Sequence, residues 1–269
     1  MEKKPIKNII ELIVVSVAIT SGIHFVSTII RNRYYGFLET IKNILKEHVK
    51  RTNYWRIIMS KVAIITGATG GLGKEFTRVI NSYGDIDEIW IVGRNQEKLN
   101  KLKKAYKKSV PICADLSDDG LEIIKEKIKA EKPNVRLLIN NAGIGYMGEY
   151  EKMDSKEVGN FCDINCTAPA VLISVVLPYM HEGAGILNVS SASSFQPNPY
   201  LALYSASKIF VKNLSRALYC ELKPRKITVT AVCPGWIDTE MLPKEMNGKK
   251  VKYTGMISAR SVVKKCFGG

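Results

Sequence analysis

A glycine-rich segment directly after a short apolar run constrains the fold of this chain more than any other feature. The run VAIIT at 62–66 leads into TGATGGLG, which ends at Gly73. Glycine lets the backbone turn tightly, and it lets N–H groups approach a phosphate at the start of the next helix. A second apolar run, IWIV at 89–92, follows a segment of helical pattern. The order strand, glycine turn, helix, strand predicts a βαβ unit that binds a nucleotide.

Further apolar runs repeat this alternation along the chain. They are LLIN at 137–140, ILNVS at 186–190 and ITVTAV at 227–232, with segments of helical pattern between them. Such alternation favours a parallel sheet covered by helices on both faces. We therefore expect an α/β fold, a Rossmann-like doubly wound parallel sheet, as a single domain at 59–269. We expect an N-terminal hydrophobic and basic helical segment at 1–58 before it.

The net charge is strongly positive, which often indicates a nucleic-acid partner. The chain has 40 Lys and Arg against 25 Asp and Glu, a formal charge of +15. Ten of the basic residues and four of the acidic ones lie in residues 1–60. Elsewhere the lysines are dispersed and form no cluster interleaved with aromatic residues. We therefore expect no nucleic acid as a partner.

The six cysteines show neither a Cys-x-x-Cys pair nor the spacing of zinc ligands. Most of them stand in apolar surroundings, as small buried thiols do. This pattern predicts a reducing compartment and no structural metal.

An uncharged apolar run lies near the N-terminus. Nineteen residues, 12–30, contain no Lys, Arg, Asp or Glu, which is long enough to cross a bilayer. Basic residues flank both ends, so charge gives no orientation, and no signal-peptidase site follows. Residues 31–58 are amphipathic and basic, which suits an anionic membrane surface. We expect membrane association through residues 9–58.

Other structures remain open for this segment. Serine, threonine and histidine dilute the apolar run, so a helix on the membrane surface or a helix packed on a partner would also fit. Residues 31–58 can equally form a solvated helix that joins anchor to domain. Met59 could itself start a soluble, cytoplasmic protein.

Four motifs occur in a fixed order after residue 59. They are TGxxxGxG at 66–73, NNAG at 140–143, a serine at 191, and YSASK, which contains Tyr204 and Lys208. Together they resemble the short-chain dehydrogenase/reductase family, over about residues 59–266. The resemblance implies a homo-oligomeric oxidoreductase that moves a hydride between a nicotinamide dinucleotide and a carbonyl or secondary alcohol. The residues around these motifs, together with the N-terminal apolar segment, resemble the branch that contains 3-oxoacyl and hydroxysteroid reductases. This resemblance implies a lipophilic substrate.

Tyr204 and Lys208 stand four residues apart and share one face of a helix. By itself such a pair is usually two surface neighbours. A free phenol has a pKa near 10, and a nearby cation favours the phenolate. The resemblance implies that Tyr204 is the acid/base and that Lys208 also holds the nicotinamide ribose. A close ammonium together with a cationic nicotinamide ring is expected to lower the pKa of Tyr204.

Two more side chains complete the expected site. Ser191 stands at the end of an apolar strand, where its hydroxyl can stabilise charge that develops on the substrate oxygen. Its serine neighbours at 190, 193 and 194 leave the register open, but the interval of thirteen residues to Tyr204 favours Ser191. The resemblance implies that Asn165 helps to hold a water and the lysine in a proton relay. A helix cap is the alternative for Asn165.

The end of the second strand bears on the choice of cofactor. An acidic side chain there would bind the ribose hydroxyls of NAD, whereas a basic one would pair with the 2′-phosphate of NADP. The residues present are Gly93 and Arg94. We expect NADP(H) rather than NAD(H), with an exposed loop arginine as the alternative. Asp115 resembles the aspartate that lies near the adenine in the family, although it could also cap a helix.

The segment PG-x-x-x-T at 234–239 resembles the part of the family that approaches the nicotinamide carboxamide, here with Thr239. We expect cofactor contacts from Gly67, Thr69, Gly70, Gly71, Leu72, Gly73, Arg94, Asp115, Leu116, Asn141, Ala142, Gly143, Tyr204, Lys208, Pro234, Gly235, Ile237 and Thr239.

Two alternative functions remain open for this chain. It could be a catalytically silent sensor that binds a dinucleotide, or a membrane-associated scaffold of the same fold. Because NADPH is a cytosolic reductant, the catalytic domain is expected to face the cytoplasm. The resemblance also implies one more strand than the chain contains before Gly269.

Overall fold

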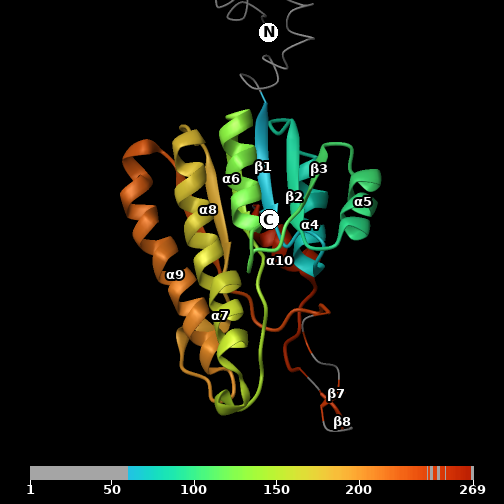
Figure 1. Cartoon of the computed structure of the whole chain (residues 1–269), viewed down its shortest axis with the longest axis vertical. Coiled ribbons are helices and arrows are strands. Elements are labelled where there is room, and N and C mark those ends of the chain that lie inside the picture. The colour runs from blue at the N-terminus through green and yellow to red at the C-terminus, as the bar shows by residue number, and fades with distance from the viewer. Residues whose placement is uncertain (1–59, 241, 243–244, 247–248, 252, 268–269) are drawn as a thin grey trace, which may run out of the picture. The chain divides into compact units, whose positions relative to one another are not determined.

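The computed structural model describes residues 60–240, 242, 245–246, 249–251 and 253–267 (Figure 1). The N-terminal hydrophobic segment expected at 1–58, its membrane association and the proposed start of the domain at Met59 lie outside the described residues.

Six parallel strands form the central sheet. They are β1 Lys61–Thr66, β2 Glu88–Gly93, β3 Ser109–Cys113, β4 Asn134–Asn140, β5 Gly185–Val189 and β6 Thr228–Val232. Their order across the sheet is β3-β2-β1-β4-β5-β6. Strands are added to one side of β1 up to β3 and to its other side from β4 onward, so the topological switch point lies between β1 and β4. This is the doubly wound, Rossmann-like order, and the predicted fold class is confirmed. The short strands β7 Glu245–Met246 and β8 Lys249–Lys250 pair separately.

Helices connect the strands of the sheet. The α-helices are α4 Gly71–Asn81, α5 Gln96–Ala105, α6 Gly120–Glu131, α7 Ser155–Cys162, α8 Ala168–Val176, α9 Ala202–Leu222 and α10 Ala259–Cys266. A π-helical turn, η2 Asp163–Thr167, joins α7 to α8. Short 3-10 turns are η1 Tyr150–Lys152, η3 Leu177–Tyr179, η4 Ala192–Phe195 and η5 Lys223–Arg225.

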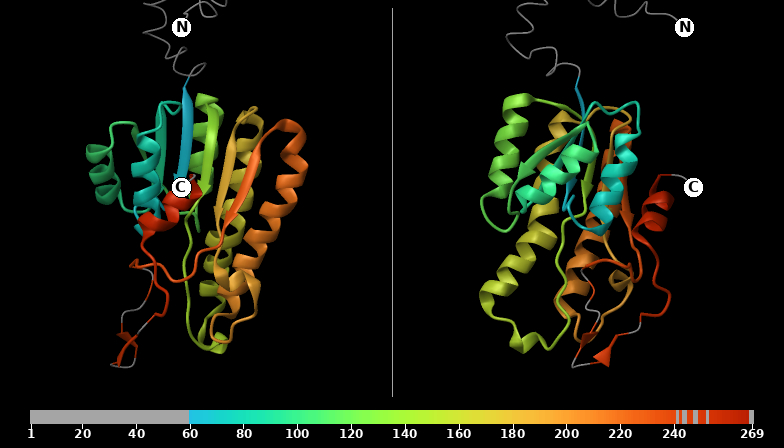
Figure 2. Two further views of the ribbon diagram at one scale, coloured as in Figure 1. Left: turned by 180° about the vertical axis from the view of Figure 1, so that it is seen from behind. Right: turned by 90° about the vertical axis from the view of Figure 1, so that its right-hand side faces the viewer.

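The helices cover both faces of the sheet, and β1 illustrates why. Alternate side chains of a strand point to opposite faces. Val62 and Ile64 pack into a core with residues of α6, α8 and α9. Ala63 and Ile65 pack into a second core with residues of α4, α5 and α10. The side view in Figure 2 shows these helical layers on either side of the sheet. A strand buried on both faces reads as a continuous apolar run, as VAIIT does.

The sequence analysis missed one strand, β3. Its sequence SVPIC contains Pro111 and only two buried side chains, those of Ser109 and Ile112. It lies at the edge of the sheet and pairs only with β2. Proline is tolerated at such an edge because one side of the strand needs no N–H donor. The short, half-buried pattern gave no periodic signal.

The expectation of buried cysteines was wrong. All six are free thiols, but Cys113 and Cys220 are exposed and the other four are partly exposed. Apolar neighbours in the sequence do not bury a side chain that a helix or an edge strand turns outward.

One helical stretch among the described residues, Ser155–Tyr179, is long and apolar enough to cross a membrane by length and composition. It combines α7, η2, α8 and η3. Leu172 and Val176 within it are fully buried against the sheet. This stretch is therefore a core helix of the domain.

A buried polar chain crosses the centre of the fold. The Nδ2 of Asn140 donates to Oδ1 of Asn188 at 2.8 Å. The Nδ2 of Asn188 then donates to Oγ of Ser215 at 2.8 Å. These bonds tie β4, β5 and α9 together.

Candidate active site

A cavity of about 990 Å³ opens at the carboxyl end of the parallel strands. Nearly all the predicted site residues line it: Gly67, Thr69, Gly70, Gly71, Leu72, Arg94, Asp115, Leu116, Asn141, Ala142, Gly143, Ser191, Tyr204, Lys208, Pro234, Gly235, Ile237 and Thr239. Gly73 and Asn165 lie behind its wall. The carboxyl ends of strands beside a switch point are where such folds bind ligands.

Close packing explains the glycines of the turn between β1 and α4. Gly67 has a φ of +61°, and a Cβ there would lie 2.9 Å from the Cα of Ala142. A Cβ on Gly73 would lie 2.2 Å from the carbonyl oxygen of Gly67, so Gly73 serves the turn itself. A Cβ on Gly71 would lie 2.5 Å from Cγ2 of Thr239. The turn is thereby held against both NNAG and the PG segment.

Tyr204 and Lys208 lie in the first turns of α9, at the inner end of the cavity. The Nζ of Lys208 lies 5.6 Å from the centre of the Tyr204 ring and donates to the carbonyl of Val189 at 3.0 Å. The hydroxyl of Ser190 donates to the carbonyl of Lys208 at 2.7 Å. Ser191 lines the cavity and is hydrogen-bonded to Tyr204 through its side chain. Both serines line the cavity, but the hydroxyl of Ser190 is engaged by the backbone carbonyl of Lys208.

The pKa of Tyr204 in the protein alone is governed by burial. Burial raises it, and the hydrogen bond with Ser191 lowers it by less. Burial also lowers the pKa of Lys208 to about 8. A low-polarity environment disfavours both charged forms, so it opposes the attraction between ammonium and phenolate. In the protein alone the pKa of Tyr204 is therefore raised, and the expected lowering, which counts on a cationic nicotinamide as well, stays a prediction.

Asn165 lies inside the π-helical turn η2 and does not cap a helix. Its side chain is almost fully buried, at 1% exposure. Its Oδ1 accepts from the N–H of Ile144 at 2.9 Å, and its Nδ2 donates to the carbonyl of Ile144 at 2.9 Å. A third bond runs from Nδ2 to Oγ of Ser207 at 3.3 Å. A Cβ on Gly143 would lie 3.3 Å from both Asn165 Oδ1 and Lys208 Nζ.

Arg94 and Asp115 face each other at the opposite end of the cavity. The guanidinium Nη1 lies 3.8 Å from Oδ2 of Asp115, and both side chains are well exposed. Burial raises the pKa of Asp115, but hydrogen bonds from Ser117 and the charge of Arg94 outweigh it, so the pKa is lowered. An exposed pair of this kind contributes about 0–1 kcal/mol. Arg94 can therefore turn to another anion at small cost.

The sequence analysis did not name the other wall of the cavity. Ile144, Tyr146, Met147, Leu201, Trp236 and Leu242 line it. They come from three irregular loops, which follow β4, η4 and β6 and carry no periodic pattern. Ser207, bonded to Asn165, was also missed, although it stands within the YSASK motif itself.

The donor set of the cavity fits a nicotinamide dinucleotide. No side chain caps the first turn of α4, whose N-cap is Gly70, and the turn carries no acidic residue, so its N–H groups are available to a pyrophosphate. A basic group lies at one end and a tyrosine and lysine at the other. Among the described residues, no cluster of side chains could hold a metal ion.

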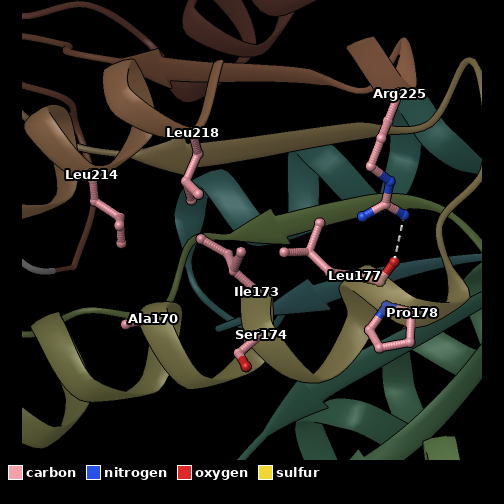
Figure 3. A pocket seen from close by; sticks show the side chains of 8 residues that line it. All are labelled: Ala170, Ile173, Ser174, Leu177, Pro178, Leu214, Leu218 and Arg225. Atoms are coloured by element: carbon pink, nitrogen blue, oxygen red, sulfur yellow. Dashed lines mark hydrogen bonds between the residues drawn. The ribbon is translucent and has the colours of Figure 1, made fainter. Parts of the chain in front are cut away.

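A second, smaller hollow of about 350 Å³ lies apart from this site, between α8, η3 and α9 (Figure 3). Its lining is mostly apolar, with Leu214 and Leu218 of α9 facing Ile173 of α8. Arg225 closes one end, where its Nη2 donates to the carbonyl of Leu177 at 2.8 Å.

Comparison with known proteins identifies relatives that belong to one family. A family model described as "short chain dehydrogenase" matches residues 61–250. A very-long-chain 3-oxoacyl-CoA reductase of Anas platyrhynchos is 33% identical, over 66% of this chain and 60% of the relative. An inactive hydroxysteroid dehydrogenase-like protein 1 of Homo sapiens is 32% identical, over 66% and 56%. The chain thus spans about six tenths of the length of these relatives.

A solved structure agrees on the fold. A short-chain dehydrogenase from Sphingobium yanoikuyae in complex with NADPH has a TM-score of 0.68 and 25% identity. The match covers 77% of this chain and 83% of that one.

Proposed function

The chain belongs to the short-chain dehydrogenase family, and from that premise we propose that it is an NADP(H)-dependent oxidoreductase that interconverts a carbonyl and a secondary alcohol. One observation carries the proposal: Ser191, Tyr204 and Lys208 converge at one end of a cavity whose other end holds Arg94.

The proposed chemistry divides between the cofactor and the chain. A bound nicotinamide would supply the hydride for reduction or accept it in oxidation. Ser191 and Tyr204 hold the substrate oxygen, and Tyr204 gives its proton to that oxygen as the carbonyl carbon is reduced. The raised pKa of Tyr204 keeps the phenol protonated and ready for this step. Oxidation follows the same path in reverse.

Lys208 and Asn165 support the proton transfer. Lys208 would hold the nicotinamide ribose hydroxyls, and its ammonium favours the phenolate that forms as Tyr204 loses its proton. Asn165 holds the backbone of Ile144 on both its N–H and its carbonyl, beside Gly143 and Lys208. In the proposed relay, these groups return a proton to Tyr204.

The proposed preference for NADP(H) over NAD(H) rests on Arg94. Its guanidinium can form two parallel hydrogen bonds with a 2′-phosphate, which carries more charge than the carboxylate of Asp115.

The proposed substrate is a lipophilic ketone or the matching alcohol, such as a 3-oxoacyl or steroid compound. The loops opposite the cofactor side provide apolar and aromatic lining, with Met147, Leu201 and Trp236 among them. The relative of Anas platyrhynchos is named for a 3-oxoacyl-CoA substrate.

An NADPH-oxidation screen tests the proposal. The full-length chain, prepared with its membranes, is given NADPH and a panel of 3-oxoacyl-CoA, steroid and aldehyde carbonyls. We expect turnover with at least one lipophilic ketone, and loss of that turnover in Tyr204→Phe. Full turnover by Tyr204→Phe would contradict the proposed mechanism.

A second candidate function is dinucleotide binding without turnover, as a sensor or scaffold. The human relative, which is named as inactive, favours it. NADPH binding in equilibrium dialysis together with no oxidation across the panel would support this candidate.

Location and assembly complete the proposal. We place the protein at a membrane through residues 9–58, with the catalytic domain in the cytoplasm, and we expect a homo-oligomer. Deletion of residues 1–58 should release the protein from membranes and keep its activity. Analytical ultracentrifugation of that shortened protein measures the assembly.

A further inference from the structure

We propose that Ser207 is a positioning residue, which holds Asn165 and Tyr204 in one hydrogen-bonded chain and so tunes the proton transfer. This inference rests on the proposed function, because it concerns how that site handles its proton.

The chain of bonds is short and buried. The hydroxyl of Ser207 donates to the carbonyl of Tyr204 at 2.7 Å. The same Oγ accepts from Nδ2 of Asn165 at 3.3 Å. Ser207 is 3% exposed and Asn165 is 1% exposed. Bulk water has little access to replace either bond, so the loss of one would leave a buried polar group unpaired.

These bonds fix which way the amide of Asn165 points. A serine hydroxyl has one proton, and Ser207 uses it on the carbonyl of Tyr204. Its Oγ can therefore only accept from Asn165, which turns the amide nitrogen toward Ser207. The N–H of Ile144 needs an acceptor and finds Oδ1 on the other side. Both neighbours thus select the same orientation of the amide.

The orientation matters for the charge of Lys208. A Cβ on Gly143 would lie 3.3 Å from Asn165 Oδ1 and 3.3 Å from Lys208 Nζ, so the amide oxygen and the ammonium flank the same backbone position and lie no more than twice that distance apart. A partly negative oxygen favours the charged lysine, which burial opposes. The charged lysine in turn favours the phenolate of Tyr204. Ser207 therefore acts on Tyr204 both through its backbone and through Asn165 and Lys208.

The same helix provides a matched control in Ser215. It is 1% exposed, and its hydroxyl donates to the carbonyl of Val211 at 2.7 Å. It also accepts from the amide of an asparagine, Asn188, at 2.8 Å. The bonding pattern resembles that of Ser207, but Ser215 stands two turns further along α9 and bonds to Asn188 instead of Asn165. Ser215→Ala removes a comparable pair of bonds without touching the site.

The experiment compares Ser207→Ala with Ser215→Ala in the full-length protein. Thermal unfolding first confirms that both fold. The ultraviolet absorbance of tyrosinate is then titrated against pH without substrate, with Tyr204→Phe as the blank. Steady-state oxidation of 3-hydroxydodecanoyl-CoA with NADP⁺ is measured over the same pH range.

We expect Ser207→Ala to lower kcat about three- to tenfold at unchanged KM, as the loss of one or two hydrogen bonds allows. The Tyr204 titration and the rising limb of the pH profile should both move to higher pH by about half a unit, a threefold change in the equilibrium. Ser215→Ala should move neither. Ser207→Thr keeps a hydroxyl that can bond back to the helix, and it should restore both.

Equal titrations for the two alanine variants would overturn the inference, because Ser207 would then serve only the packing of α9. If Ser207→Ala does not fold, Ser207→Cys keeps the size of the side chain and weakens both bonds, and the same shift is expected of it. Failure of the proposed function is distinguishable, because it would appear as no oxidation across the substrate panel or as full turnover by Tyr204→Phe, whereas the tyrosinate titration needs no substrate.

Discussion

The two ends of the cavity hold their polar groups in different ways. At the reaction end, Asn165 and Lys208 are 1% and 5% exposed, and hydrogen bonds to neighbouring groups fix them. At the other end, the side chains of Arg94 and Asp115 are 64% and 40% exposed and lie 3.8 Å apart. Buried bonds are strong and directional, whereas exposed charges are weak and screened by salt. The comparison suggests that geometry governs the chemistry and that charge governs the choice of cofactor.

The largest expected effect comes from Tyr204→Phe. Removing the hydroxyl takes away the acid/base while leaving the ring in place, so kcat for NADPH oxidation should fall by about 10²–10⁴-fold. Binding of NADPH, measured by fluorescence, should change little. Tyr219→Phe on the exposed side of the same helix is the control.

Ser191→Ala should be next in size. Loss of the donor to the substrate oxygen is expected to lower kcat by about 10²–10³-fold. Ser193 also lines the cavity, and Ser193→Ala should remain near the activity of the natural protein. The reverse order of these two variants would show that the serine register chosen from the interval to Tyr204 is wrong.

Arg94→Asp tests the exposed end. Exchanging a charge-assisted bond for repulsion should shift the ratio of kcat/KM for NADPH over NADH by about 10- to 100-fold toward NADH. The shift should shrink as salt is added, because both charges are exposed. Activity with NADH should persist, since the reaction end is unchanged. A ratio equal to that of the natural protein would refute the assignment.

The pH dependence of NADPH binding gives the smallest effect. The pKa of Lys208 is lowered to about 8, so its ammonium is present below that pH and is lost above it. If Lys208 holds the nicotinamide ribose, NADPH affinity should fall by up to about tenfold between pH 7 and 9, as one charged hydrogen bond weakens. Lys208→Met should bind NADPH weakly at both values. A pH-independent affinity in the natural protein would contradict this role.

Sequence patterns predicted those strands that are apolar over their whole length and those turns that contain a family motif. β1 and the glycine turn are local patterns, and the order of the motifs brought Ser191 and Tyr204 together correctly. Burial could not be predicted in the same way. The pKa of Tyr204 depends on how much protein surrounds it, and in the protein alone it is raised.

Contacts between distant parts of the chain could not be predicted from sequence patterns either. Arg94 follows β2 and Asp115 follows β3, and β3 was missed because an edge strand with Pro111 shows no periodicity. The pair at 3.8 Å appears only once the two strands are paired. Ser207 was visible in YSASK, but only the fold shows that Asn165 reaches it.

The buried pair of Asn140 and Asn188 has a consequence for how the chain assembles. The two residues stand opposite each other in the pairing of β4 with β5. A slip of β5 by one residue would turn Asn188 to the other face of the sheet and separate the two amides, at a cost of about 1–3 kcal/mol for a buried polar group left unpaired. Asn140 is the first residue of the NNAG motif, and Ser191 stands two residues after the end of β5. Selecting the register during folding therefore also aligns the cofactor wall with the reacting serine, before either has a ligand.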